Sequence, residues 1–448
     1  MMSIFNISKL LIILFLVMGV ALSGCFVAEN PYTAVAPGMW RATLTLDPVA
    51  ASVRGESAAA GGFGKLEEIV RGELPFNFEV KYEGANRFYI EIHNGEERIR
   101  VDSISFGRDR KTAKDTILIH FPVFDSYIRA IYQEKVMQGE WVVNYRENYT
   151  IPFVAKQGEA HRFTTLRKPP AANVSGRWEV RFDSEGEQPY LAVGEFQQQD
   201  NYLTGTFLTE TGDYRFLEGT VQDDKVYLSC FDGSHAFLFE AKMQPNGTLS
   251  GSFLSGTHYR ATWEARRNSE FQLNDPHSLT FLKPGYDRVE FAFENPDGKI
   301  ISLNEPPYQG KVTIIQLMGT WCPNCRDETE FLLQYRKKNP QLDIAIIGLA
   351  FERYRDRDRS MQAIRQYRDY FQLDYEILLA GTSSDKAEAA RALPMLNQVL
   401  SYPTMIIVDK RGRVRQIHTG FSGPATSAYA AFQREFDDLI KQLLAESS

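Results

Sequence analysis

The residues of this chain best suited to chemistry are two cysteines separated by two residues, Cys322 and Cys325. An apolar run at 312–317 precedes them and a helical pattern at 326–338 follows, so the pair is predicted to open a helix at the end of a strand. Unsatisfied N–H groups and the helix dipole favour a thiolate at that position. The spacing places the second sulfur within bonding reach. The pair is therefore predicted to form and break an intramolecular disulfide and to release a mixed-disulfide partner.

A CxxC pair can also belong to a zinc site, a c-type haem site or a purely structural disulfide. A structural zinc site needs two more ligands, but no second CxxC or neighbouring His pair exists, and His277 and His418 are distant in sequence. A c-type haem site needs CxxCH, but position 326 is Arg. A purely structural disulfide fits the strand–turn–helix context poorly. We therefore predict no metal and no cofactor.

The N-terminus has the pattern of an export signal. Lys9 precedes an apolar run at 10–22 that is too short for a comfortable membrane span, and Ser23 and Gly24 lead to Cys25. This ending resembles the lipobox of bacterial lipoproteins, which implies cleavage before Cys25 and its lipidation. An ordinary signal peptide, or an uncleaved anchor with an incidental cysteine, is the alternative. Phe26, rather than an aspartate, implies sorting to the outer membrane, facing the periplasm, in a Gram-negative envelope.

The chain is too long, at 448 residues, for one ordinary domain, and its 43% hydrophobic and 24% charged residues are typical of globular proteins. A net charge of −7 with mixed signs argues against nucleic-acid binding. Changes in pattern predict these boundaries: 1–24 signal peptide, 25–37 tether, 38–168 β-rich domain, 173–267 small antiparallel barrel-like domain, 268–284 linker and 285–448 α/β domain.

The two N-terminal units are predicted to be all-β, as antiparallel sandwiches or lipocalin-like barrels. In the first unit, residues alternate between apolar and polar as at 40–46, and 94–95 reads Asn-Gly, a hairpin signal. Residues 50–64 are predicted to form a loop, and the apolar spacing at 125–138 suggests a helical turn.

In the second unit, short strands with Gly at the turns predict a small up-and-down barrel, with a sandwich as the alternative. Gly176-Arg177-Trp178 resembles the first strand of lipocalin-like barrels, and Gly38-Met39-Trp40 opens the first unit in the same way. We expect aromatic side chains, rather than a bound ligand, to fill the barrel, and Cys230 to be a small buried apolar residue. The expected strands are 177–182, 191–197, 203–208, 214–221, 225–230, 236–243, 248–253 and 258–265.

The C-terminal third changes to alternating strands and helices, which predicts an α/β layer fold. The charged run 352–359 within it is expected to be a solvated loop and helix start, with partner docking as the alternative. The expected strands are 312–317, 344–349 and 405–408, and the expected helices are 326–338, 360–371 and 428–444.

This third, roughly 289–444, resembles thioredoxin, and more closely the membrane-tethered TlpA/ResA branch of bacterial thiol–disulfide oxidoreductases. The resemblance depends on several phrases taken together: WCPNC after a strand, Tyr402-Pro403-Thr404 before another strand, Asp297-Gly298-Lys299, Gly310-Lys311-Val312 and Asp409-Lys410-Arg411-Gly412.

The resemblance implies the site. Cys322 would attack and Cys325 would resolve the mixed disulfide. Pro403 would be a cis-proline facing the pair, and Trp321, Tyr402 and Thr404 would join it in binding the substrate.

Proton transfer is the point at which the sequence departs from thioredoxins proper. Their buried strand acid is replaced here by Gln316, so proton transfer falls to Glu328 or to water. The alternative for Glu328 is an ordinary exposed helix glutamate.

Two functions of different classes follow. The first is an enzyme that exchanges disulfides in envelope proteins, with these proteins and an unknown redox partner as its partners. The second is a lipid-anchored binding protein whose β units recognise a ligand or partner, with an auxiliary redox domain. A peroxiredoxin is a weaker third, because that family uses a lone peroxidatic Cys and this chain has a CxxC.

Overall fold

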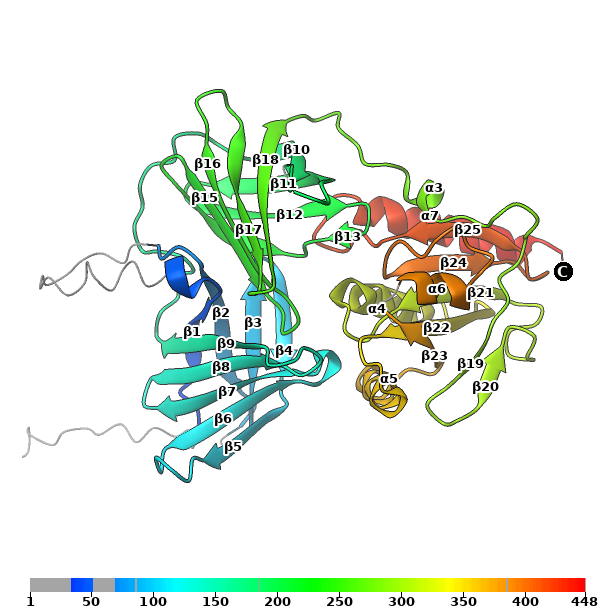
Figure 1. The fold of residues 1–448 in the computed structure, drawn as a ribbon, viewed down its shortest axis with the longest axis horizontal. Coiled ribbons are helices and arrows are strands. Elements are labelled where there is room, and N and C mark those ends of the chain that lie inside the picture. Colours follow the sequence, from blue (N-terminus) through cyan, green and yellow to red (C-terminus); the bar gives the residue numbers. More distant parts are fainter. Residues whose placement is uncertain (1–33, 51–68, 85–86, 185, 384–385, 448) are drawn as a thin grey trace, which may run out of the picture.

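The computed structural model describes residues 34–50, 69–84, 87–184, 186–383 and 386–447 (Figure 1). The predicted signal peptide and lipidated Cys25, and all but Ala50 of the loop predicted at 50–64, lie outside these residues. The described strands form three sheets, two antiparallel and one mixed. The predicted class, two all-β units followed by an α/β unit, is confirmed.

The first sheet is open and curved, with nine antiparallel strands in the order β4-β3-β2-β1-β9-β8-β7-β6-β5. It is a single layer, so the sandwich alternative is not realised in these strands. The elements are β1 (Gly38–Thr45), β2 (Glu73–Tyr82), β3 (Phe88–Asn94), β4 (Glu97–Val101), β5 (Ile104–Arg108), β6 (Asp115–Phe121), the 3-10 helix η1 (Pro122–Phe124), β7 (Ser126–Gln133), β8 (Val136–Val143) and β9 (Thr150–Gln157).

The helical turn predicted at 125–138 is wrong. These residues form the β7–β8 hairpin, in which Ile128 lies opposite Trp141. The apolar spacing fits a helix and a strand equally well, and β7 pairs with β6 on its other side. Pairing with two neighbours satisfies the backbone of this segment, which explains why it is extended. The predicted Asn94-Gly95 turn is confirmed, because β3 ends at Asn94 and β4 begins at Glu97.

The second sheet closes into a barrel, because β11 pairs with β12 as well as with β10. Aromatic side chains fill it, and the buried ring of Phe239 contacts those of Phe207, Phe253 and Trp263. Its strands are β10 (Gly176–Phe182), β11 (Tyr190–Gln199), β12 (Tyr202–Thr209), β13 (Gly212–Asp213), β14 (Leu217–Gln222), β15 (Lys225–Phe231), β16 (Ala236–Met243), β17 (Leu249–Ser255) and β18 (Tyr259–Arg267).

The expected strand 214–221 begins only at Leu217, because Arg215 adopts a left-handed conformation with φ 58°. Cys230 is a free, fully buried cysteine, as predicted. The two Gly-x-Trp openings are structurally alike. The indole N–H donates to the carbonyl four residues earlier in both units, from Trp40 to Ala36 at 3.0 Å and from Trp178 to Val174 at 2.9 Å.

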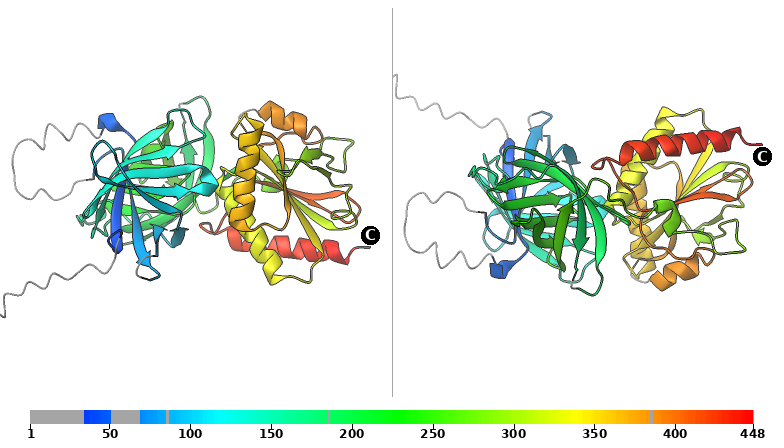
Figure 2. Two further views of the ribbon diagram at one scale, coloured as in Figure 1. Left: turned by 90° about the horizontal axis from the view of Figure 1, so that it is seen from below. Right: turned by 90° about the horizontal axis from the view of Figure 1, so that it is seen from above.

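The third sheet is mixed, in the order β20-β19-β23-β22-β21-β24-β25. Its apolar side chains form two groups on opposite faces, one packed with α4, α5 and α7 and the other with α6. Figure 2 shows that α4 and α5 lie on the side of this sheet that faces the β units. The elements are α3 (Pro276–Leu279), β19 (Ala292–Glu294), β20 (Ile300–Ser302), β21 (Val312–Met318), α4 (Pro323–Lys338), β22 (Ile344–Glu352), α5 (Arg357–Phe371), β23 (Glu376–Thr382), α6 (Lys386–Ala392), β24 (Thr404–Val408), β25 (Val414–Thr419) and α7 (Tyr429–Ala445).

Candidate active site

Cys322 and Cys325 form a disulfide where the central strand β21 turns into α4. Cys322 is the N-cap of the helix, and the backbone N–H of Cys325 donates to its Sγ at 3.2 Å. Pro323 occupies the first turn, where its missing N–H costs no hydrogen bond. The Cys322 sulfur therefore lies where backbone N–H groups stabilise the thiolate form.

The loop before β24 faces the disulfide. The Tyr402–Pro403 peptide bond is cis, and the carbonyl oxygen of Tyr402 lies 3.4 Å from Sγ of Cys322. The Trp321 and Tyr402 rings meet edge to face at 6.1 Å. Thr404 is fully buried and donates to the carbonyl of Ser401 at 2.9 Å, so its side chain supports this loop from inside. The structure thus brings the predicted substrate-binding residues together around the disulfide.

Glu328 is fully buried on α4, which excludes the alternative of an exposed helix glutamate. Neither carboxylate oxygen has a hydrogen-bond partner among the described residues. Burial raises the pKa of Glu328 to about 8, against its usual 4.5. The amide of Gln316 donates to the carbonyl of Cys325 at 3.1 Å and its oxygen accepts from Thr329 at 3.2 Å. Glu328 is thus a buried titratable group one helical turn after Cys325, whereas Gln316 cannot titrate.

Glu328→Gln should change how stability depends on pH. The wild-type carboxyl stays protonated in the folded state up to about pH 8 but ionises near 4.5 when unfolded. Wild-type stability should therefore fall by about 4–5 kcal/mol from pH 4 to pH 9 because of this group, and the variant should lack this fall. Urea unfolding across that range measures it. Glu330→Gln, on the same helix, is the matched control and should keep the wild-type pH dependence; equal slopes for Glu328→Gln and wild type would contradict the prediction.

Two further residues beside the disulfide were missed from sequence. Glu352 is buried, and its carboxylate accepts from the Thr320 backbone N–H at 3.0 Å and from the Thr320 hydroxyl at 2.8 Å. Burial raises the pKa of Glu352 to about 7. The Arg353 guanidinium lies 4.0 Å from the centre of the Trp321 ring. The expectation of a solvated run at 352–359 is therefore wrong at its first two residues, which follow the apolar strand β22 directly into the site.

Segments of the barrel cover the redox site. The hydroxyl of Ser401 donates to the carbonyl of Thr211 at 2.7 Å, and the Asn324 amide donates to the carbonyl of Asp213 at 3.2 Å. Ser234 donates to the carbonyl of Trp321 at 3.2 Å. Only 5% of the surface of Cys322 is exposed. A folded protein can therefore reach Cys322 only if these barrel segments move.

A buried ion cluster joins the three sheets beside α4. The guanidinium of Arg215 is 4% exposed and pairs with Glu97 of the first sheet, Asp232 of the barrel and Asp327 of α4. It also donates to the carbonyl of Pro323 at 3.3 Å. Burial raises the pKa of Asp327 to about 7, although Arg215 opposes this rise. The cluster holds the barrel against the helix that carries the disulfide.

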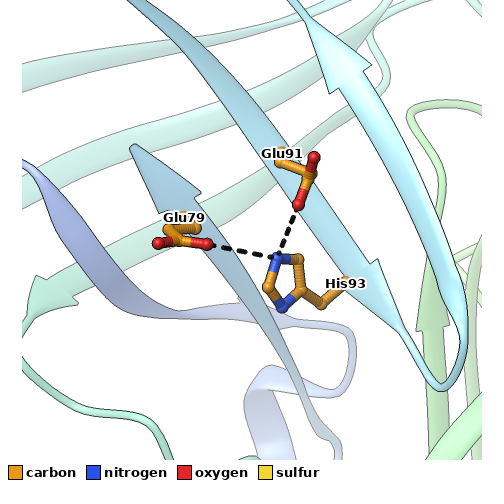
Figure 3. A group of neighbouring side chains, drawn as sticks. All are labelled: Glu79, Glu91 and His93. Carbon is orange, nitrogen blue, oxygen red and sulfur yellow. Dashed lines mark ion pairs between the residues drawn. The ribbon is translucent and has the colours of Figure 1, made fainter. Parts of the chain in front are cut away.

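One group of residues among the described ones has the composition of a metal site, Glu79, Glu91 and His93 on β2 and β3 (Figure 3). The His93 Nε2 atom lies 3.3 Å from Glu91 and 3.9 Å from Glu79. The ammonium of Lys81 already contacts both carboxylates, at 2.5 Å from Glu91 and 3.3 Å from Glu79. These carboxylates thus have a cationic partner from the chain itself.

A strand–CxxC–helix unit facing a cis-proline loop on a mixed sheet defines a thioredoxin-like domain, and comparisons with known proteins agree. The profile described as AhpC/TSA family matches residues 284–417. The thioredoxin-like protein YneN of Bacillus subtilis is 25% identical over 141 residues, or 31% of this chain and 73% of that protein. Thiol-disulfide oxidoreductase ResA of the same species is 23% identical over 141 residues, or 31% of this chain and 69% of that protein.

Solved structures were compared in the same way. A thioredoxin-family thiol:disulfide interchange protein from Chlorobium tepidum aligns with 36% of this chain and 96% of its own, at 21% identity and a TM-score of 0.27. The profile and the two sequence relatives show that the C-terminal region is similar to thiol–disulfide oxidoreductases, and the predicted enzyme class is confirmed at that level. In the part of the chain that the structure describes, no helix has the length and apolar character needed to cross a bilayer.

Proposed function

We propose that this protein is a lipid-anchored, extracytoplasmic thiol–disulfide oxidoreductase that exchanges disulfides in envelope proteins through Cys322 and Cys325. The observation that carries the proposal is the position of Cys322 at the N-terminus of α4, 3.4 Å from the carbonyl that precedes Pro403. Nucleophile, helix N-terminus and facing loop are the parts that thiol–disulfide exchange needs. The reaction requires no cofactor.

The proposed exchange follows from these positions. In the dithiol form, the Cys322 thiolate attacks one sulfur of a client disulfide, and the other client sulfur leaves as a thiolate. Cys325 then attacks Sγ of Cys322 and releases the client, which has gained two electrons, while the Cys322–Cys325 disulfide re-forms. Glu328 is proposed to take the Cys325 proton during this second step when its carboxyl is ionised, a minor form at neutral pH because burial raises the pKa of Glu328 to about 8. Transfer in the opposite direction uses the same steps reversed.

The location is proposed from the N-terminal sequence. An apolar run ending in Leu22-Ser23-Gly24-Cys25 supports export and lipidation, and an oxidising compartment lets disulfides persist. Replacing Cys25 by alanine should block lipidation and move the protein out of the membrane fraction. Fractionation with a lipid label on the wild type and the variant measures this, and unchanged labelling of Cys25→Ala would contradict the proposed anchor.

Trapping clients tests the proposed substrates. Reduced Cys325→Ala should accumulate a mixed disulfide through Cys322, because the residue that resolves it is missing. We expect DTT-sensitive adducts with envelope proteins, identified by mass spectrometry. Cys322→Ser/Cys325→Ala, which keeps only the buried Cys230 of the described cysteines, is the matched control and should form none. Equal adducts in both variants would contradict exchange through Cys322.

The binding-protein alternative has support in one observation, a cavity at the barrel mouth that both β units and Arg353 line. If binding is the main role and the redox domain is auxiliary, insulin reduction by the full chain should not exceed the rate with DTT alone. Peroxide consumption measured on the same samples tests the peroxiredoxin alternative. We expect the protein to consume peroxide no faster than DTT alone.

A further inference from the structure

A hollow near the redox site lies where the three sheets meet. It holds about 840 Å³ and is lined by both β units and by the segment after β22. Cavities that hold small ligands typically measure about 300–1,000 Å³ and occur at domain junctions and barrel mouths. This one opens at the mouth of the barrel, and Phe253 of the aromatic barrel filling forms part of its wall. Its size and place are those of a ligand site, separate from the disulfide.

The barrel side of this cavity is aromatic. Tyr190, Tyr214, Phe237 and Phe253 line it, and their rings are rigidly packed, with Tyr214 at 5.1 Å from Phe237 and 5.2 Å from Phe253. Leu191 lines the mouth and is 45% exposed. Rigid apolar walls with an open rim can bury the hydrocarbon part of a ligand at little cost in side-chain ordering.

The opposite side is cationic. Arg146 and Arg353 both line the cavity, and neither forms a salt bridge with a carboxylate among the described residues. Each guanidinium lies over aromatic faces instead: Arg146 is 5.3 Å from the Tyr149 ring centre, and Arg353 is 4.7 Å from that of Tyr145. Burial and the nearby Arg146 lower the pKa of Arg353. An anion placed between the two would therefore gain two guanidinium groups as charged hydrogen-bond donors.

Three other titratable side chains that line the cavity, His258, His235 and Glu210, do not neutralise the positive charge of Arg146 and Arg353. Nε2 of His258 lies 3.0 Å from the Arg146 guanidinium, which can only donate, so His258 accepts and is neutral. Burial, Arg146 and Arg353 together lower the pKa of His258 to about 4. His235 has its own acid, Asp232, at 3.4 Å. Glu210 on the barrel wall accepts from the Asn274 amide at 2.5 Å.

We propose that this cavity binds an amphiphile with a single anionic head, a carboxylate or a phosphate, whose head lies between Arg146 and Arg353 and whose apolar body packs on the barrel aromatics. The site draws one arginine from the first sheet and the other from the redox domain. A bound ligand would therefore contact both β units and the redox domain. Trp321, which lies under Arg353, would sense the head.

Calorimetric titration of the full chain with decanoate, below its micelle-forming concentration, tests the proposal. Decyltrimethylammonium has the same tail and the opposite charge, acetate has the head alone, and decyl phosphate separates the two head types. We expect saturable binding of decanoate, decyl phosphate or both, much weaker binding of the other two, and a change in tryptophan fluorescence on saturation.

Variants locate the site. Arg146→Gln and Arg353→Gln should each weaken binding by about 10- to 100-fold, the effect of losing a charged hydrogen bond. Leu191→Asp, at the exposed rim, should weaken it by repulsion without disturbing the core. Arg368→Gln on α5, paired with Asp297 away from the cavity, is the matched control and should bind as wild type. Equal affinity for decyltrimethylammonium, no binding of either anionic amphiphile, or unchanged affinity in both arginine variants would overturn the proposal.

Discussion

Cys322→Ser should lower DTT-dependent insulin reduction to the rate of DTT alone. The serine hydroxyl is not ionised at neutral pH and cannot form a mixed disulfide, so the first step of exchange is lost entirely. The N-cap hydrogen bond can survive the change, because a serine oxygen also accepts from the Cys325 N–H. The variant should therefore fold normally, and activity and stability can be measured on the same sample.

The matched control for this loss is Cys230→Ala. Cys230 is buried in the barrel, and burial raises the pKa of its thiol well above the usual value, so it should take no part in exchange. We expect wild-type insulin reduction from this variant. Residual activity in Cys322→Ser, or a loss in Cys230→Ala without a loss of stability, would move the chemistry away from the CxxC.

The redox centre was predictable because its parts are local in sequence. The strand, the CxxC and the helix are continuous from 312 to 338. The free N–H groups and the dipole of the helix act on groups within its first turn, which here includes Cys322. The cis-proline loop lies about 80 residues further on, and only the family resemblance linked Tyr402 and Pro403 to the disulfide. Burial of Glu328 was not readable from its helical position alone, since exposure depends on what packs above α4.

The barrel segments that cover the site were not predictable, because they lie far from the CxxC in the sequence. Thr211, Asp213 and Ser234 reach the redox domain only after the barrel closes and docks, and no short-range pattern signals that contact. Arg215 looked like part of an alternating strand. Its backbone is left-handed instead, and its three carboxylate partners lie on the first sheet, in the barrel and on helix α4.

The covered disulfide and the ion cluster have a joint consequence. Exchange with a folded client needs the barrel segments to leave α4, and the same motion separates Arg215 from Asp327. Breaking that contact inside the protein costs more than breaking a surface pair, because it leaves buried charges without partners. We therefore expect the cluster to set how readily the site opens.

Arg215→Met tests this directly and should have the largest effect on stability. Methionine fills part of the space but leaves Glu97, Asp232 and Asp327 without their shared cation, so we expect the free energy of unfolding to fall by about 3–5 kcal/mol. Lys242→Met breaks an exposed pair with Asp224 on the barrel and should cost at most about 1 kcal/mol. Urea unfolding at neutral pH measures both variants.

The same variant reports on access to the disulfide. Once reduced, Cys322 of Arg215→Met should react with a bulky maleimide several-fold faster than in wild type under conditions where both are folded, because the barrel is held less firmly. Lys242→Met should react at the wild-type rate. A loss of stability without faster labelling would mean that the cluster supports the fold but not the closure. Labelling as fast in wild type as in the variant would mean that the cover moves away freely and does not limit exchange.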